Sequence, residues 1–200
     1  MKSKTMAVFS LENIKTAKHN LLPENAKPIK NFIKDKGVSG SLLTEESGIY
    51  IFWWHGDIDS FRKTVINSTF LVKGKKSHQS QIKICFSQEW LDCATHNGKV
   101  CLYVGKTTSI RDRVSKHLKL GSTNIWKGKP KNSGIKPNTV SQMRIGLETV
   151  YDRNMLEEIK ENVSLSYHPM NKYAEAINRF YVEDYFIAHY FPLFNIDVER

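Results

Sequence analysis

The fold of this chain is decided by two short stretches, GIYIFWW at residues 48–54 and KVCLYVG at residues 99–105. Both are rich in β-branched and aromatic side chains, and both are predicted to form strands. Further short strands and helices follow each other along the chain without a repeating βα unit. The sequence therefore predicts an α+β fold, in which a small antiparallel or mixed sheet is flanked by helices.

Side chains alternate between the two faces of a strand, so each predicted strand has an apolar face for a core. On its other face the first strand carries Tyr50 beside Gly48, and the second carries Tyr103 beside Cys101 and Gly105. Glycine leaves room for a bulky group to approach the backbone. A tyrosine in a strand can also simply pack its ring, and each phenol taken alone is compatible with that role.

A helix is predicted directly after the second strand, because Ser109 to Asp112 resembles a capping box. The helix runs to about Leu120, and its apolar residues recur every four positions as a buried stripe. Arg113 and His117 form an i, i+4 pair at the edge of that stripe, and the cation Lys116 lies beside them. A solvated basic face is the alternative interpretation.

Other elements are predicted with less detail. They are two short helices within 10–37 that use Ser10 and Pro28 at their starts, a strand at 82–86, a hairpin turn at 97–98, helices at 140–150 and 155–163, a strand at 163–167 and a helix at 171–190. The segment 61–76 is compatible with either helix or strand.

The charge of the chain is unusual for an ordinary globular domain. Lysine and arginine number 30 against 20 aspartates and glutamates, a net charge of +10. Residues 101–150 hold most of the excess, with ten basic and two acidic residues, and they include the lysine-rich loop 121–138. Such a local excess indicates a polyanionic partner such as nucleic acid, or else a merely solubilising surface.

Composition excludes several other classes. No apolar run approaches the roughly 20 residues that span a bilayer, so no membrane partner is expected, and no signal peptide is recognised. The cysteines are Cys85, Cys93 and Cys101, which is an odd number without a C-x-x-C pair. They are expected to be packing residues of a cytoplasmic protein, since Cys93 and His96 lack the partners of a regular zinc site.

The final predicted helix carries Glu183 among aromatic and aliphatic residues. Phe180, Ile187 and Phe191 mark an apolar flank beside it. A carboxylate in such surroundings is costly to bury unless it is paired or binds a metal. Arg179, four residues earlier, is the candidate ion-pair partner.

Together these residues resemble the GIY-YIG nuclease superfamily. The matching elements, in the order of the family, are Gly48-Ile49-Tyr50, Tyr103-Val104-Gly105, the helix with Arg113 and His117, Glu183, and Asn195. The resemblance implies a nuclease-like domain at 46–200, with a long insertion at 55–97 between the motif strands and the basic loop at 121–138. Residues 1–45 lie outside it and are expected to form a helical N-terminal extension.

The resemblance implies a DNA endonuclease that hydrolyses phosphodiester bonds with one Mg²⁺ or Mn²⁺ held by Glu183. Arg113 would stabilise charge on the scissile phosphate. Tyr50 would be the general base or orient water, and as a base its pKa would have to be lowered by nearby cations or by a hydrogen bond to His117. The spacing leaves Tyr103 open for the same role. Gly48, Gly105 and Asn195 would support the site. The residues expected to contact DNA phosphates are Lys106, Lys116, Lys127, Lys129 and Lys131.

The small size of the chain favours a restriction-type or phage-defence enzyme, acting as a homodimer or by transient pairing on double-stranded DNA. A nucleic-acid-binding module that keeps the fold without chemistry is the main alternative. A protein whose basic surface binds an acidic protein is another, and it would lack a salt-sensitive affinity for DNA.

Overall fold

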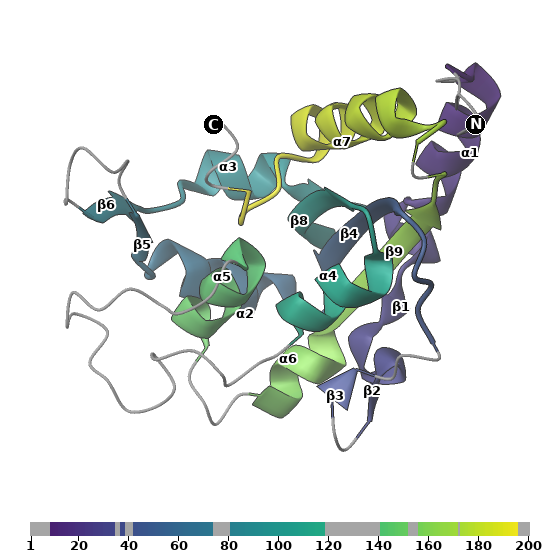
Figure 1. Ribbon diagram of the computed structural model, residues 1–200. Helices are drawn as coiled ribbons and strands as arrows, with labels where there is room; N and C mark the ends of the chain where they lie inside the picture. Colours follow the sequence, from purple (N-terminus) through teal and green to yellow (C-terminus); the bar gives the residue numbers. More distant parts are fainter. Residues whose placement is uncertain are drawn as a thin grey trace, which may run out of the picture.

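The computed structural model describes residues 9–34, 37–38, 42–73, 81–118, 141–151, 156–171 and 173–195. A five-stranded antiparallel sheet runs through them with helices on both sides (Figure 1). In spatial order its strands are β1 (Lys27–Pro28), β9 (Val163–Pro169), β4 (Gly48–Trp54), β8 (Lys99–Thr107) and β7 (Thr95–His96). The helices are α1 (Leu11–Asn20), α2 (Ile58–Ile66), α3 (Gln88–Cys93), α4 (Ile110–His117), α5 (Gln142–Val150), α6 (Leu156–Asn162) and α7 (Ala176–Tyr190). The α+β prediction is confirmed.

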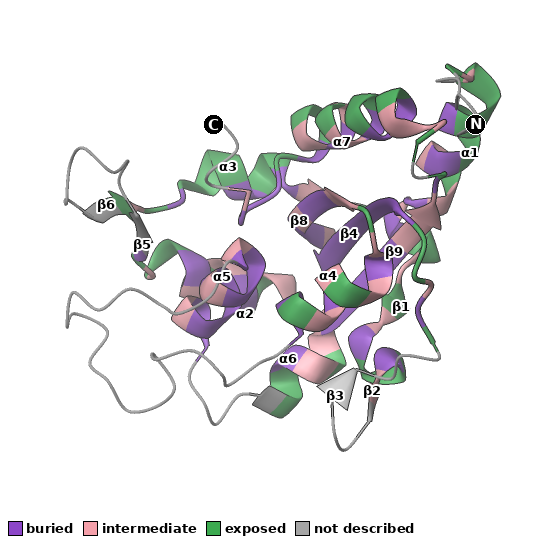
Figure 2. Ribbon diagram, in the orientation of Figure 1, coloured by how far each residue is buried: buried purple, intermediate pink, exposed green. Residues whose placement is uncertain are grey.

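The central strand β4 is buried along its whole length, because helices cover both faces of the sheet (Figure 2). Tyr50, Phe52 and Trp54 point to one face, which we call the α4 face, where α2, α4, α5 and α6 supply the facing apolar residues. Ile49, Ile51 and Trp53 point to the other, the α7 face, which α1 and α7 cover. The sheet therefore has two cores, and neither face of β4 is open.

The pairing of β4 with β8 contains a β-bulge that changes the predicted faces. Tyr50 lies opposite Gly105 and Phe52 opposite Tyr103, but Trp53 lies opposite Cys101, so one residue of β8 is extra. A bulge breaks the period of two. Cys101 consequently belongs to the core of the α7 face, and the expectation that it shares a face with Tyr103 is wrong.

The N-terminal segment is built into the sheet. Ser10 caps α1 by accepting a hydrogen bond from the amide of Asn13 (3.2 Å), as predicted. Lys27 and Pro28 form β1 and pair with β9. The helix predicted to start at Pro28 is only a short 3₁₀ turn, η2 (Ile29–Phe32), which begins directly after Pro28. A second 3₁₀ turn, η1 (Pro23–Asn25), precedes β1.

The segment between β4 and β8, which was expected to be an insertion, folds against the α4 face. It consists of α2, a hairpin of β5 (Phe70–Lys73) and β6 (Gln81–Ile84), and α3. Phe70 anchors the hairpin, with its ring centroid 5.2 Å from that of Phe86 and 5.7 Å from that of Phe194. A smaller hairpin of β2 (Ile33–Lys34) and β3 (Gly37–Val38) precedes β4. The turn at 97–98 is confirmed, since Asn97 and Gly98 both have positive φ.

The helix stripes agree with the sequence in α4 and differ in α7. Ile110, Val114 and Leu118 are buried as predicted. In α7 the buried apolar residues are Val182, Phe186 and Tyr190, whereas Phe180 is 56 % exposed. The predicted flank through Phe180 is therefore wrong: α7 turns its other side to the sheet.

The basic loop 121–138, with Lys127, Lys129 and Lys131, lies outside the described residues.

Cys101 is buried as expected, but Cys85 and Cys93 are exposed and do not pack in the core. No helix in the described ranges has both the length and the apolar character that crossing a bilayer requires.

Candidate functional site

A buried hydrogen bond joins the first motif strand to the helix that follows the second. The hydroxyl oxygen of Tyr50 on β4 lies 2.8 Å from Nε2 of His117 on α4, and both side chains are fully buried. Nε of Arg113, one turn earlier on α4, donates to the same oxygen at 3.4 Å. Three residues singled out by the sequence therefore meet at one phenol oxygen.

The start of α4 fixes this geometry. Ser109 caps the helix by accepting a hydrogen bond from the amide of Asp112 (3.3 Å), as the capping-box pattern predicts. Ile110 and Val114 then pack against the sheet. Because residues four apart share a helix face, the same turns direct Arg113 and His117 toward Tyr50.

His117 has a second partner that the sequence did not indicate. Its Nδ1 lies 2.7 Å from the hydroxyl of Ser141, which also caps α5 by accepting a hydrogen bond from the amide of Arg144 (3.1 Å). Because the Tyr50 oxygen accepts from Nε of Arg113, we assign the Tyr50 proton to the bond with Nε2 of His117, which leaves Nδ1–H to donate to Ser141. Only the capping pattern ahead of α5 could have drawn attention to Ser141.

The surroundings keep both Tyr50 and His117 neutral. Burial, followed by the positive charges of Arg113 and Arg144, holds the pKa of His117 well below its usual value. Burial and the neighbouring Tyr103 raise the pKa of Tyr50 well above that of a free phenol, although Arg113 opposes them. The lowered pKa expected of Tyr50 as a base is therefore wrong, because burial outweighs the nearby cation. Near pH 7 the pair is therefore a neutral phenol donating to a neutral imidazole.

Arg113 remains charged although it is partly buried. Burial lowers its pKa, but the oxygens of Tyr50 and Tyr103 outweigh that effect and raise the pKa. A charged guanidinium beside two phenols can attract a phosphate group from the solvent side.

Tyr103 forms the more accessible side of the cluster. Its ring stacks on that of Tyr50 with 6.1 Å between centroids, and it lies 5.0 Å from the ring of His117, yet Tyr103 is only half-buried. Gly105 makes this packing possible, because a Cβ built there would lie 2.5 Å from the Tyr50 hydroxyl oxygen and 2.8 Å from a Tyr103 ring carbon. Gly48 is equally confined, with the carbonyl oxygen of His168 2.3 Å from such a Cβ.

Glu183 is paired with Lys106, at the end of β8 on the α7 side of the sheet. Its Oε1 accepts a hydrogen bond from the backbone amide of Lys106 at 2.9 Å, and its Oε2 forms an ion pair with the Lys106 ammonium. The predicted partner, Arg179, instead donates to the carbonyls of Met170 and Asn171. The Glu183 charge is still near enough to contribute, behind burial and Tyr103, to the raised pKa of Tyr50.

The donor atoms at Glu183 fit a metal site of one particular type. Among the described residues, no group of three or more His, Cys, Asp or Glu side chains is placed to hold a metal ion, which also applies to Cys93 and His96. Glu183 does hold a cation, the Lys106 ammonium, on a side chain that is 13 % exposed. Mg²⁺ is commonly bound by one or two carboxylates together with phosphate oxygens of the substrate. Glu183 would therefore be one ligand of such an ion, and the other ligands would have to be oxygens from outside the described residues.

Asn195 supports the second motif strand from the chain segment after α7. Its Oδ1 accepts a hydrogen bond from the amide of Val104 at 2.8 Å, and its Nδ2 donates to the carbonyl of Val104 at 2.7 Å. The amide of Phe194 also donates to the carbonyl of Leu102 (2.8 Å). The segment 194–195 therefore supplies hydrogen-bond partners for the backbone amide and carbonyl of Val104 and for the carbonyl of Leu102.

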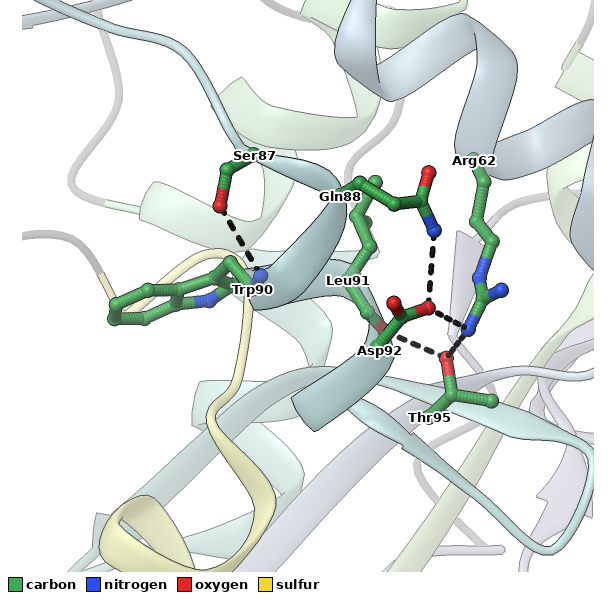
Figure 3. A network of polar contacts seen from close by, with 7 residues as sticks. All are labelled: Arg62, Ser87, Gln88, Trp90, Leu91, Asp92 and Thr95. Carbon is green, nitrogen blue, oxygen red and sulfur yellow. Dashed lines mark hydrogen bonds and ion pairs between the residues drawn. The ribbon is translucent and has the colours of Figure 1, made fainter.

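An open pocket of about 280 Å³ lies elsewhere, between α2 and α3 of the insertion. Figure 3 shows how the two helices are tied beside it: Arg62 forms an ion pair with Asp92 (3.0 Å) and donates to Thr95 (2.9 Å). None of the residues that line it belongs to the predicted site. Its lining residues are Asp59, Arg62, Lys63, Ile66, Asn67 and Gln88.

The structure thus brings four predicted residues, Tyr50, Tyr103, Arg113 and His117, into one cluster, with Glu183 and Lys106 paired nearby. Lys116 is exposed on α4. Comparison of the chain with protein-family models, with curated proteins and with solved structures gave no match.

Proposed function

We propose that the protein is a metal-dependent endonuclease of the GIY-YIG type, which hydrolyses phosphodiester bonds in double-stranded DNA. The observation that carries this proposal is the contact of the Tyr50 hydroxyl with both His117 and Arg113. These side chains come from the first motif strand and from the helix after the second, which are the elements that carry the residues matching the family.

Arg113 is the group that receives the scissile phosphate. Its charge is retained, and its guanidinium presents several donors that match phosphate oxygens. Charge that develops on the phosphate in the transition state is stabilised by donors already in place.

Tyr50 and His117 form the proton-accepting pair. As Tyr50 takes a proton from the attacking water, it passes its own proton to Nε2 of His117, which lies 2.8 Å away. Burial and, after it, the positive charge of Arg113 hold down the pKa of His117, so a phosphate that neutralises Arg113 makes the imidazole a better acceptor. Tyr103, the half-buried phenol, orients the water and the phosphate on the solvent side.

Glu183 is the candidate ligand for Mg²⁺ or Mn²⁺. A bound divalent ion would neutralise charge on the phosphate oxygens and on the leaving oxygen. The chain's own part is to hold the carboxylate in place, which the Lys106 amide does through Oε1.

The proposal includes the DNA contacts, the location and the biological role expected from the sequence. The basic region contacts DNA, through residues that include Lys116, Lys127, Lys129 and Lys131. The protein is cytoplasmic and acts in restriction or phage defence. Cutting both strands with one-metal sites needs two active sites, which favours a homodimer or transient pairing on DNA.

The decisive experiment is DNA cleavage. Supercoiled plasmid and unmethylated phage DNA are incubated with the protein and Mg²⁺ or Mn²⁺, beside Glu183→Ala and Arg113→Ala. Lys160→Met, which removes a lysine paired with Glu157, is the control for loss of one charge. Wild type and the control should cut and both site variants should not. Equal cutting by Glu183→Ala would reject the metal assignment, and intact DNA in every reaction would reject the nuclease.

A non-catalytic nucleic-acid-binding module is the second candidate. It is favoured by one observation: both carboxylate oxygens of Glu183 are bonded to Lys106, so the carboxylate has a structural role already. Such a module would bind DNA with a steep salt dependence but leave it intact with either metal.

A further inference from the structure

Lys106 makes two different bonds to the same carboxylate. Its backbone amide holds Oε1 of Glu183, a bond that belongs to the fixed end of β8. Its ammonium pairs with Oε2 at the end of a flexible side chain. The backbone bond positions Glu183 whatever the side chain does, so the ammonium can leave without displacing the carboxylate.

The ammonium is also held on its other side. Nζ lies 4.2 Å from the ring centroid of Phe180, one turn before Glu183 on α7. The Lys106 side chain is 31 % exposed and that of Glu183 only 13 %. The Lys106 side chain is therefore nearer to the solvent than the Glu183 carboxylate with which it is paired.

A divalent ion and the ammonium compete for this carboxylate. Two cations bound to one carboxylate oxygen would lie close enough to repel each other strongly. A metal ion on Oε2 requires the ammonium to move, and an exposed anion such as a DNA phosphate is the partner that would stabilise it after the move.

We propose that the side chain of Lys106 acts as a gate of the metal site. While DNA is absent, its ammonium is paired with the Glu183 carboxylate. When DNA binds, the ammonium moves to pair with a DNA phosphate, and the carboxylate becomes available to the metal ion. This inference rests on the proposed function. With such a gate, DNA binding raises the affinity of Glu183 for the metal ion, because the ammonium has moved away from the carboxylate. Coupling between two binding sites is reciprocal, so metal binding also raises the affinity for DNA.

The test measures Mn²⁺ affinity of the free protein by electron paramagnetic resonance, without DNA. Lys106→Met removes the competing charge, keeps the backbone amide and leaves an apolar side chain against Phe180. It should bind Mn²⁺ roughly tenfold more tightly than wild type, a coupling of ordinary size. Lys106→Arg retains a cation and should bind as weakly as wild type.

Two controls make the comparison specific. Lys160→Met removes a lysine that is also 31 % exposed and paired with a glutamate, and it should leave Mn²⁺ affinity unchanged. Adding Glu183→Gln to Lys106→Met should abolish the gain. Circular dichroism of each variant verifies the fold.

A second measurement adds a DNA duplex to Tyr50→Phe protein, which is expected to cut the duplex roughly 100-fold more slowly than wild type, and is completed before cleavage is detectable. Mn²⁺ affinity should rise on addition of the duplex, and this rise should be smaller when Lys106→Met is also present. Equal Mn²⁺ affinity of wild type and Lys106→Met without DNA, or no measurable binding by either, overturns the gate.

The failure of the gate and that of the nuclease have different signatures. Cleavage by wild type together with unchanged Mn²⁺ affinity in Lys106→Met rejects the gate alone. A Glu183-dependent gain in Mn²⁺ affinity without cleavage by any protein supports the gate at a metal site and rejects the nuclease.

Discussion

The hydroxyl of Tyr50 donates to Nε2 of His117 across 2.8 Å, between a fully buried strand and a fully buried helix face. This bond is therefore both a structural link between β4 and α4 and the centre of the proposed proton transfer.

Protonation of His117 should destabilise the fold at mildly acidic pH. Its pKa is lower in the folded protein than in the unfolded chain, so its contribution to stability is complete above about pH 6.5 and is lost as pH falls toward the folded pKa. The free energy of unfolding should decrease by at most about 1.4 kcal/mol per pH unit from this residue. Urea denaturation at pH 7.5 and pH 5.5 measures it.

The variant His117→Gln should reduce that pH dependence without removing it. His55, His96 and His168 also have lowered pKa values, chiefly through burial, and they keep part of the slope. An unchanged slope in His117→Gln would show that the folded protein tolerates a charged imidazole beside Tyr50.

The two tyrosines should respond differently to loss of the hydroxyl. Tyr50→Phe leaves His117 Nε2 buried without its partner, which costs about 1–3 kcal/mol, and should reduce cleavage by roughly 100-fold or more by removing the proton acceptor. Tyr103→Phe should reduce cleavage with little change in stability. Thermal unfolding and plasmid cleavage on the same samples separate the effects, and a stability loss confined to Tyr103→Phe would reverse the assignment.

Gly105→Ala should destabilise the protein through crowding. Its Cβ would lie 2.5 Å from the Tyr50 hydroxyl oxygen, and the rings of Tyr50 and Tyr103 would have to shift. The expected loss is about 1–3 kcal/mol. Gly98→Ala is the comparison in which no atom lies within 4 Å, although its positive φ adds backbone strain instead. Denaturant unfolding measures both, and a Gly105→Ala variant as stable as wild type would contradict the packing described for the cluster.

Asn195→Ala should loosen the middle of β8. It removes two hydrogen bonds to Val104, which together contribute about 1–3 kcal/mol. Hydrogen exchange of the Val104 amide should accelerate more than that of Ile51, a neighbour on β4. Uniform acceleration across the sheet would instead indicate a global loss of stability.

The sequence predicted the local elements that have strong signals of their own. The run 48–54, the capping pattern at Ser109 and the stripe through Ile110 and Val114 all depend on neighbouring residues, and the structure confirms them. A hydrogen bond between Tyr50 and His117 was one expectation that followed from the family resemblance, and the structure contains it.

The predictions that failed depend on distant contacts. The bulge in β8 is set by its pairing with β4, so period-two alternation assigned Cys101 to the wrong face. Phe180 is exposed because the side of α7 that is buried depends on the sheet beneath it. The partner of Glu183 is Lys106, 77 residues away, where local spacing favoured Arg179.

The position of β4 between β8 and β9 has a consequence for how the chain folds. One of its two neighbours, β9, follows β4 in the sequence by more than 100 residues. The chain loses entropy when so long a loop closes, and the pairing of β4 with β9 offsets this loss only after the loop has closed. Folding is therefore slow. Until β9 arrives, GIYIFWW remains an uncharged strand with an open edge, the type of segment that pairs with other copies. Folding yield should therefore fall steeply with protein concentration.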